Sequence, residues 1–237
     1  MKRLHNALKL RQLLLLKQLG YRYTDERPSD LEPEPAQLPA HLETLRKLVE
    51  GCHLCDLAKS RHKTVFGEGD PHAELMFVGE GPGATEDRTG RPFVGRAGEL
   101  LTRMIENVLH LRRDQVYIAN IVKCRPPGNR VPTPTEAFTC RPYLLKQIEI
   151  IRPRIIMTLG GTAYRYLTND ESAVSKVRGH IIRTENYLLI PTFHPSYLLR
   201  NPSAKKEAWE DLLKVRELLG NRETEEQRNG ETEKPRN

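Results

Sequence analysis

The four cysteines of this chain are the residues whose spacing indicates chemistry most directly. Two residues separate Cys52 from Cys55, and fifteen separate Cys124 from Cys140. A fold that joins the two pairs would build a pocket of four thiolates, which suits a Zn²⁺ ion or an iron–sulfur cluster. The alternatives are two disulfides, which need an oxidising compartment, or four unrelated core cysteines. The spacing alone does not distinguish zinc from iron.

Residues 79–98 form a glycine-rich segment that carries carboxylates and an aromatic residue. Its first glycines permit positive φ and let the backbone approach a ligand closely. Pro82 breaks the spacing of a nucleotide-binding loop and no phosphate-binding lysine follows, so that function is not predicted. Glu80 and Glu86 could cap the next helix, because the helix dipole favours acids there. Phe93 could be a core residue or a flat platform for a ring.

An asparagine and a histidine accompany two further apolar segments. Asn120 lies near the end of the run 116–122, and His194 directly follows the run 187–193. Burying an amide is costly unless it pairs, so Asn120 bonds either local backbone or the edge of a ligand. A lone histidine is more often structural than catalytic. However, Tyr-Leu-Leu-Arg follows at 197–200, and apolar wedges beside cations are what DNA-distorting proteins insert.

Short apolar runs and helical segments alternate through the middle of the chain. The runs are 73–78, 116–122, 155–159 and 187–193, and the helical segments are 97–110, 134–151, 161–168 and 203–219. Such alternation is typical of a parallel sheet with helices on both faces. Sites in these sheets gather beyond the carboxyl ends of the strands, where the distinctive loops of this chain are found. We therefore expect an α/β fold with its site at that edge.

The flanks differ from this middle part in charge and composition. The sequence predicts a basic helix and an acidic, proline-rich linker in residues 1–38. It predicts one domain in residues 39–220 and a disordered charged tail in residues 221–237. The formal net charge of +7 favours polyanion partners such as nucleic acid. No run approaches the roughly 18 apolar residues of a membrane span, and no secretory signal is recognised. We expect a cytoplasmic protein without membrane contact.

Taken together, these segments resemble the family 4 uracil-DNA glycosylases, which carry an iron–sulfur cluster. The matching stretches are the Cys52 and Cys55 pair, GEGPGATEDRTGRPFVGRAG (79–98), NIVKCRPPGNRVPTPTE (120–136) with Cys140, and HPSYLLRN (194–201). The resemblance implies one 4Fe-4S cluster, held by Cys52, Cys55, Cys124 and Cys140. It also implies a three-layer α/β/α sandwich with a short central parallel sheet of about four strands.

The resemblance further implies a DNA-repair enzyme that flips deoxyuridine out of DNA and hydrolyses its N-glycosidic bond, leaving an abasic site. Gly81 stands where strongly active relatives have an aspartate, so the expected carboxylate for water or for the cationic sugar is Glu80, with Glu86 second. His194 would donate to uracil O2. The uracil-binding residues would be Gly81, Pro82, Gly83, Phe93, Asn120 and His194.

DNA contacts are implied as well. Arg91, Arg96 and Arg200 would hold phosphates, and Leu198 or Leu199 would fill the gap left by the flipped nucleotide. We expect a monomer that acts on uracil in single- or double-stranded DNA, with residues 1–38 as a candidate site for a protein partner.

Two other functions compete with this one. The first is that of a bacterial relative that traps uracil-containing DNA covalently through a histidine in a basic loop. Residues 125–130, RPPGNR, contain no histidine, which disfavours it. The second is a nucleic-acid-binding module without catalysis, stabilised by a metal or a cluster, in which Glu80, Asn120 and His194 are merely structural.

Overall fold

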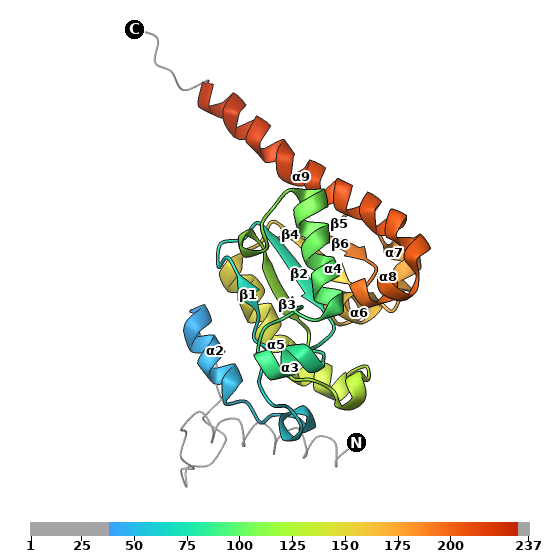
Figure 1. Ribbon diagram of the computed structural model, residues 1–237. Helices are drawn as coiled ribbons and strands as arrows, with labels where there is room; N and C mark the ends of the chain where they lie inside the picture. Colours follow the sequence, from blue (N-terminus) through green and yellow to red (C-terminus); the bar gives the residue numbers. More distant parts are fainter. Residues whose placement is uncertain (1–37, 232–237) are drawn as a thin grey trace. The chain divides into compact units, whose positions relative to one another are not determined.

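The computed structural model describes residues 38–231 (Figure 1). The chain divides into two units, Met1–Pro39 and Ala40–Asn237, and the second is described below. The predicted helix and linker at 1–38 therefore lie outside the described residues, apart from Leu38. Within the described part, no helix combines the length and the apolar character that crossing a membrane requires.

The sheet has six strands in the order β1-β3-β2-β4-β6-β5. Its four central strands are parallel and confirm the four predicted apolar runs: β2 (Leu75–Gly79), β3 (Tyr117–Asn120), β4 (Ile155–Leu159) and β6 (Leu188–Thr192). Two edge strands of two residues each, β1 (Glu68–Gly69) and β5 (Ile182–Arg183), pair antiparallel and were not predicted. Two residues are too few to show a period in the sequence.

The register aligns the carboxyl ends of the parallel strands. Gly79 at the end of β2 lies opposite Asn120 at the end of β3, and Leu159 of β4 lies opposite Thr192 of β6. The loops that follow these strands therefore leave the sheet along one edge. Glu80, Asn120, Cys124 and His194 lie at these strand ends or shortly after them.

Helices flank the sheet, as expected for an α/β protein. One apolar core joins alternate residues of the strands, such as Leu75 and Phe77, to α4, α8 and α9. Helix α5 lies on the other side of the strands from α4 (Figure 1). The α-helices are α2 (Leu42–Glu50), α3 (Ala84–Thr89), α4 (Arg96–Met104), α5 (Pro134–Ile151), α6 (Gly161–Thr168), α7 (Val174–Val177), α8 (Pro195–Arg200) and α9 (Lys205–Glu231). Short 3-10 turns span Asp56–Lys59, Arg113–Gln115, Pro127–Asn129 and Pro202–Ala204.

Two helix ends differ from the prediction. Helix α4 ends at Met104 and continues as a π-turn over Ile105–Leu109, within the predicted segment 97–110. Helix α9 runs to Glu231, so residues 221–231 are helical where a disordered tail was expected. The reason is propensity: this stretch is rich in Glu, Arg and Gln, which favour helix without any apolar contact.

Candidate active site

The loops after β2, β3 and β6 border one open cavity of about 410 Å³. Glu80, Phe93, Asn120 and His194 all line it, so four residues from separate turns meet around one hollow. Ligand pockets have volumes of roughly 300–1,000 Å³, so this hollow has the volume of a small-molecule site. The other lining residues include Gly81, Pro82, Gly83, Glu86, Arg96, Asn129, Arg130 and Ser196.

Asn120 is held at the end of β3 with an unsatisfied amide. Its side chain is 1% exposed, and Oδ1 has no hydrogen-bond partner among the described residues. A Cβ added to Gly79 on the neighbouring strand would lie 2.4 Å from Asn120 Oδ1 and 2.5 Å from Phe93 Cζ, so a glycine is needed there. A buried oxygen without a donor costs about 1–3 kcal/mol. A ligand N–H in the cavity would remove this cost.

His194 presents a defined tautomer. Its Nδ1 accepts the backbone N–H of Ser196 at 3.1 Å and lies 2.8 Å from Ser196 Oγ. The proton of the neutral ring must therefore be on Nε2, which makes Nε2 a donor. Burial lowers the pKa of His194 from 6.5 to about 4, and the charge of Arg200 adds to this effect while Glu86 opposes it. The imidazole is thus neutral near pH 7.

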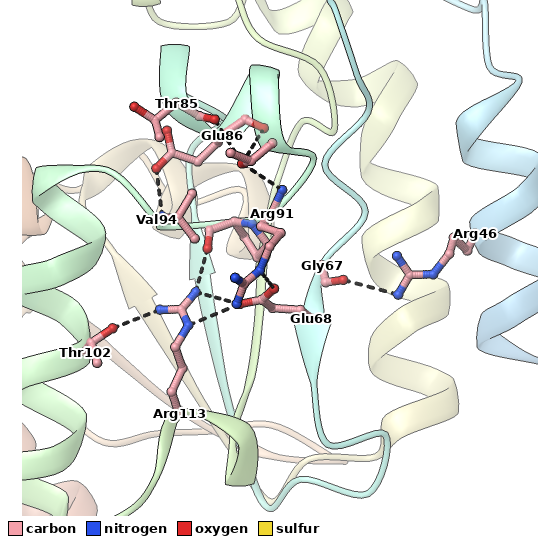
Figure 2. Close-up of polar contacts among 11 residues, drawn as sticks. Arg46, Gly67, Glu68, Thr85, Glu86, Arg91, Val94, Thr102 and Arg113 are labelled. Atoms are coloured by element: carbon pink, nitrogen blue, oxygen red, sulfur yellow. Dashed lines mark hydrogen bonds and ion pairs between the residues drawn. The ribbon is translucent and has the colours of Figure 1, made fainter.

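Phe93 has a left-handed backbone conformation, with φ of 49°. Residues other than glycine adopt it rarely, so the surrounding contacts must impose it. Arg113 Nη2 donates to the carbonyl of Pro92 at 2.5 Å, on one side of Phe93. After Phe93 in the chain, the N–H groups of Val94 and Gly95 donate to Glu86 Oε1 at 2.9 and 2.8 Å. Figure 2 shows the contact between Glu86 and Val94. The ring centroid of Phe93 lies 5.7 Å from that of His194.

A carboxylate positions Arg113 for this contact. Glu68 on β1 pairs with Arg113 at 3.0 Å and with Arg91 at 2.8 Å (Figure 2). Burial by itself raises the pKa of Glu68, but hydrogen bonds from both arginines outweigh it and lower the pKa overall. Arg91, predicted to hold a phosphate, therefore already has an acidic partner, and it does not line the cavity. Sequence reasoning missed Glu68 and Arg113, which are far apart in the chain and in no motif.

The two candidate carboxylates differ in their surroundings. Glu80 is partly buried and lines the cavity, and burial raises its pKa above 4.5 although a hydrogen bond with Thr162 opposes the shift. Glu86 instead binds backbone at Gly95, the N-cap of α4. Glu86 therefore acts as a helix cap, which was one of the predicted alternatives. The helix that it caps is α4 and not α3, which begins at Ala84.

The predicted DNA-contacting residues divide into two groups. Arg96 lines the cavity, and Arg200 is exposed on α8. Leu198 is 1% exposed and belongs to the apolar core, so the prediction that it could fill a gap in DNA is wrong for this conformation. Leu199 is partly exposed and keeps that role available. The reason is geometric: successive residues of a helix point in different directions, and Leu198 is the one turned toward the core.

The four cysteines line a second, smaller pocket. No disulfide joins them, although all four lie within the described residues. Arg61 Nη1 donates to Cys124 Sγ and the backbone N–H of Lys123 to Cys140 Sγ, both at 3.3 Å, while the Tyr143 hydroxyl lies 3.5 Å from Cys52 Sγ. Burial raises the pKa of Cys124 to about 11 and that of Cys140 to about 12. A bound metal would deprotonate such thiols, because a coordinating thiol loses its proton.

The four sulfurs are candidate ligands for zinc or for an iron–sulfur cluster. Zn²⁺ needs four ligands close to one point, with Zn–S distances of about 2.3 Å. Across residues 38–231, no group of three or more His, Cys, Asp or Glu side chains is arranged to hold a single metal ion. The four cysteines remain candidate ligands because they line one pocket and none of them is in a disulfide.

These features define a class of protein. The cavity unites a buried amide whose oxygen is unpaired, an aromatic ring and a neutral histidine donor at the carboxyl edge of a parallel sheet. The chain has a formal net charge of +7. Such a set of groups suits a flat, polar ring such as a nucleobase, and the positive charge suits a nucleic acid. The class is thus an α/β protein whose cavity has the groups that a nucleobase site needs.

Comparison with known proteins identifies the family. The family model of the uracil DNA glycosylase superfamily matches residues 66–213. One similar protein is the type-4 uracil-DNA glycosylase of Sulfurisphaera tokodaii, which is 48% identical over 75% of this chain and 84% of that protein. Another is the type-4 uracil-DNA glycosylase of Thermotoga maritima, which is 47% identical over 75% of this chain and 94% of that protein. That of Saccharolobus solfataricus is 45% identical over 77% of this chain and 88% of that protein. The chain belongs to the type-4 uracil-DNA glycosylases of this superfamily.

Proposed function

We propose that this protein hydrolyses the N-glycosidic bond of deoxyuridine in DNA, releasing uracil and leaving an abasic site for base excision repair. The enzyme class is that of its family, the uracil-DNA glycosylases, which are hydrolases of this bond. The observation that carries the proposal is the buried Oδ1 of Asn120, which has no partner among the described residues and belongs to the lining of the cavity. Uracil presents the N–H that this oxygen lacks.

Asn120 and Phe93 would select the base. The Oδ1 of Asn120 would accept from uracil N3–H, and its Nδ2 would donate to uracil O4. Cytosine presents an acceptor and a donor in the reverse order, so it would leave both groups of the amide mismatched in a buried site. Phe93 would stack on the ring, and the contacts on either side of it hold its left-handed backbone conformation.

His194 and Glu80 would act on the bond. Cleavage leaves negative charge on uracil, and a donor near O2 stabilises that charge as it develops. Because Nδ1 of His194 already accepts from Ser196, Nε2–H is the atom available for this role. Glu80 would orient the water that attacks the sugar or balance its positive charge. The contacts of Glu86 with backbone give it the role of holding the Phe93 loop.

Cys52, Cys55, Cys124 and Cys140 would hold a 4Fe-4S cluster. The support is their common pocket, their free thiols and the similarity of the chain to type-4 uracil-DNA glycosylases. Such a cluster would tie residues 52–55 to the strand end and helix that carry the other two cysteines. Iron and sulfide analysis of the purified protein tests this assignment, and tightly bound zinc without iron would refute it.

Phosphate contacts would come from Arg96 and Arg200, and Leu199 would fill the gap in the duplex. Their support is position: Arg96 borders the cavity, and Arg200 and Leu199 lie on α8, which begins directly after His194. We expect the protein to act as a monomer in the cytoplasm, with residues 1–38 as a candidate segment for binding a protein partner.

The test is a cleavage assay on an oligonucleotide with one uracil. Alkali converts each abasic site to a strand break, which a gel resolves. His194→Ala should lower the single-turnover rate by about 100-fold or more, the usual effect of removing a donor to a developing anion. The matched control is His72→Ala, because His72 is exposed and does not line the cavity. No cleavage by folded, DNA-binding wild-type protein would instead favour the non-catalytic module.

A further inference from the structure

Lys123 is a buried cation that the mechanism above does not use. It is 1% exposed and lies between Asn120 and Cys124 in the sequence. Lysine is almost never fully buried unless it is paired, because removing its charge from water is costly. None of the ion pairs found in residues 38–231 includes Lys123.

The ammonium of Lys123 instead binds neutral acceptors. Its Nζ donates to the backbone carbonyl of Asn120 at 3.0 Å and to Gln147 Oε1 at 2.6 Å. Gln147, on α5, is 0% exposed, and its Nε2 donates to the carbonyl of Phe66 at 3.0 Å and to the Tyr117 hydroxyl at 3.2 Å. A fixed chain of hydrogen bonds therefore connects α5 to the end of β3.

The backbone of the same residue contacts the cysteine pocket. The N–H of Lys123 donates to Cys140 Sγ at 3.3 Å, and its carbonyl accepts the N–H of Val65 at 2.7 Å. Lys123 thus touches the cysteine pocket through its backbone and Asn120 through its side chain. It is three residues from Asn120, so its side chain folds back along its own strand end.

The amide of Asn120 needs such support from its backbone. Its Oδ1 has no hydrogen bond within the described part of the protein, so no side-chain partner there fixes that oxygen before a ligand enters. Its direction depends on the backbone of Asn120, whose carbonyl Lys123 holds. A rotation of that peptide would turn the amide away from a base edge, where hydrogen bonds need donor–acceptor distances of about 2.7–3.2 Å.

We propose that Lys123 is a positioning residue that joins the four-cysteine pocket to Asn120 and thereby sets the affinity for uracil. This inference rests on the proposed function, in which Asn120 reads the base. Through Lys123, the cysteine pocket helps to fix the orientation of the Asn120 amide, which distinguishes uracil from cytosine. The cysteines then contribute to base recognition as well as to folding.

A double-mutant cycle tests the proposal. Lys123→Met removes the ammonium and keeps most of the apolar stem, and Asn120→Ala removes the amide. The probe is an oligonucleotide whose deoxyuridine carries a 2′-fluorine that resists cleavage, and the measurement is its Kd relative to the same strand with cytosine. Lys123→Met should weaken the preference about tenfold, near the lower end of the effect of a lost hydrogen bond from a charged donor. In the Asn120→Ala background it should have no further effect.

A matched control separates positioning from general loosening of the cysteine pocket. Tyr143→Phe removes the hydroxyl beside Cys52 Sγ and leaves the contacts of Asn120 unchanged. It should not alter the preference for uracil. In both variants the iron content per protein should equal that of the wild type.

Three results would overturn the proposal. The first is an unchanged preference for uracil in folded Lys123→Met. The second is a loss of preference that is equally large with and without Asn120, and the third is a preference that falls only together with iron content. If Lys123→Met does not fold, Gln147→Ala replaces it in the same cycle with the same expected results, because Gln147 orients the ammonium. If the wild-type protein itself shows no preference for uracil, the proposed function fails rather than the role of Lys123.

Discussion

Replacing Glu86 by glutamine should weaken the fold slightly and leave the chemical step nearly unchanged. The Oε1 of Glu86 accepts two backbone N–H groups, at Val94 and Gly95, and these contacts hold the loop that carries Phe93. Glutamine keeps an acceptor oxygen and loses the charge. Hydrogen bonds to charged groups contribute about 1.5–3 kcal/mol and neutral ones about 0.5–1.5 kcal/mol, so each contact should lose about 1 kcal/mol.

The expected total is at most about 2 kcal/mol, because two contacts weaken. Partial exposure of Glu86 reduces the effect of its charge, which brings the expected value nearer to about 1 kcal/mol. For a chain of this size, about 1 kcal/mol lowers Tm by about 2–4 °C. Glu86→Ala should cost more, since it leaves both N–H groups without this acceptor and releases the strained backbone at Phe93.

The assay compares Glu86→Gln with Glu80→Gln in single-turnover cleavage of a uracil-containing oligonucleotide, together with thermal unfolding of both variants. Glu86→Gln should keep the cleavage rate within a few-fold of the wild type, whereas Glu80→Gln should lower the rate with little change in Tm. The reasoning is refuted if Glu86→Gln loses about 100-fold in rate, the effect typical of a general base, while its Tm is unchanged.

The remaining predictions concern pH, the Phe93 loop and the two leucines of α8. Because burial lowers the pKa of His194 from 6.5 to about 4, the folded state binds fewer protons than the unfolded state between these values, and stability falls as pH falls from 6.5 toward 4. Urea unfolding at pH 7 and pH 5 should show the wild type losing about 2 kcal/mol more than His194→Asn, and equal losses would contradict the buried neutral histidine. The pKa of Glu80 is raised, so cleavage should decline with falling pH before an ordinary glutamate, of pKa 4.5, would protonate, and Glu80→Gln should flatten that decline. Arg113→Met should raise KM more than it lowers kcat, because it frees the Pro92 carbonyl beside Phe93, whereas the exposed control Arg112→Met should change neither. Leu198→Ala should destabilise the fold by about 2–5 kcal/mol, because it truncates a core side chain. Leu199→Ala should keep Tm and slow cleavage of duplex DNA more than cleavage of single strands. The reverse pattern would show that Leu198, and not Leu199, fills the gap in the duplex.

The central sheet could be predicted because its strands are buried on both faces. Residues 155–159 and the three other runs are mostly apolar and end at loops rich in Gly, Pro or Cys, which is the pattern of parallel strands. The edge strands β1 and β5 have no such pattern, since they are two residues long and one is a Glu-Gly pair. The helical continuation of α9 to Glu231 depends on residue propensity alone, which apolar periodicity does not report.

The site could be predicted as a set of residues but not as a set of contacts. Asn120 and His194 could be predicted as site residues because a polar side chain at the end of a buried strand costs free energy unless it forms hydrogen bonds. The tautomer of His194 depends on the backbone of Ser196, and the conformation of Phe93 depends on Arg113 and Glu86. These contacts depend on the three-dimensional arrangement of the residues, so they could not be predicted from the sequence.

The burial of Leu198 is another feature that could not be predicted from the sequence. The motif Tyr-Leu-Leu-Arg names two neighbouring leucines, and only the helix phase decides which one faces the core. In α8 that residue is Leu198, at 1% exposure.

A crystal structure of the protein with free uracil tests the central claim most directly. Uracil should occupy the cavity with N3–H on Asn120 Oδ1, O4 on Nδ2, O2 within reach of His194 Nε2, and its ring against Phe93. Uracil bound elsewhere, or bound in the cavity with Asn120 Oδ1 still unpaired, would contradict the account.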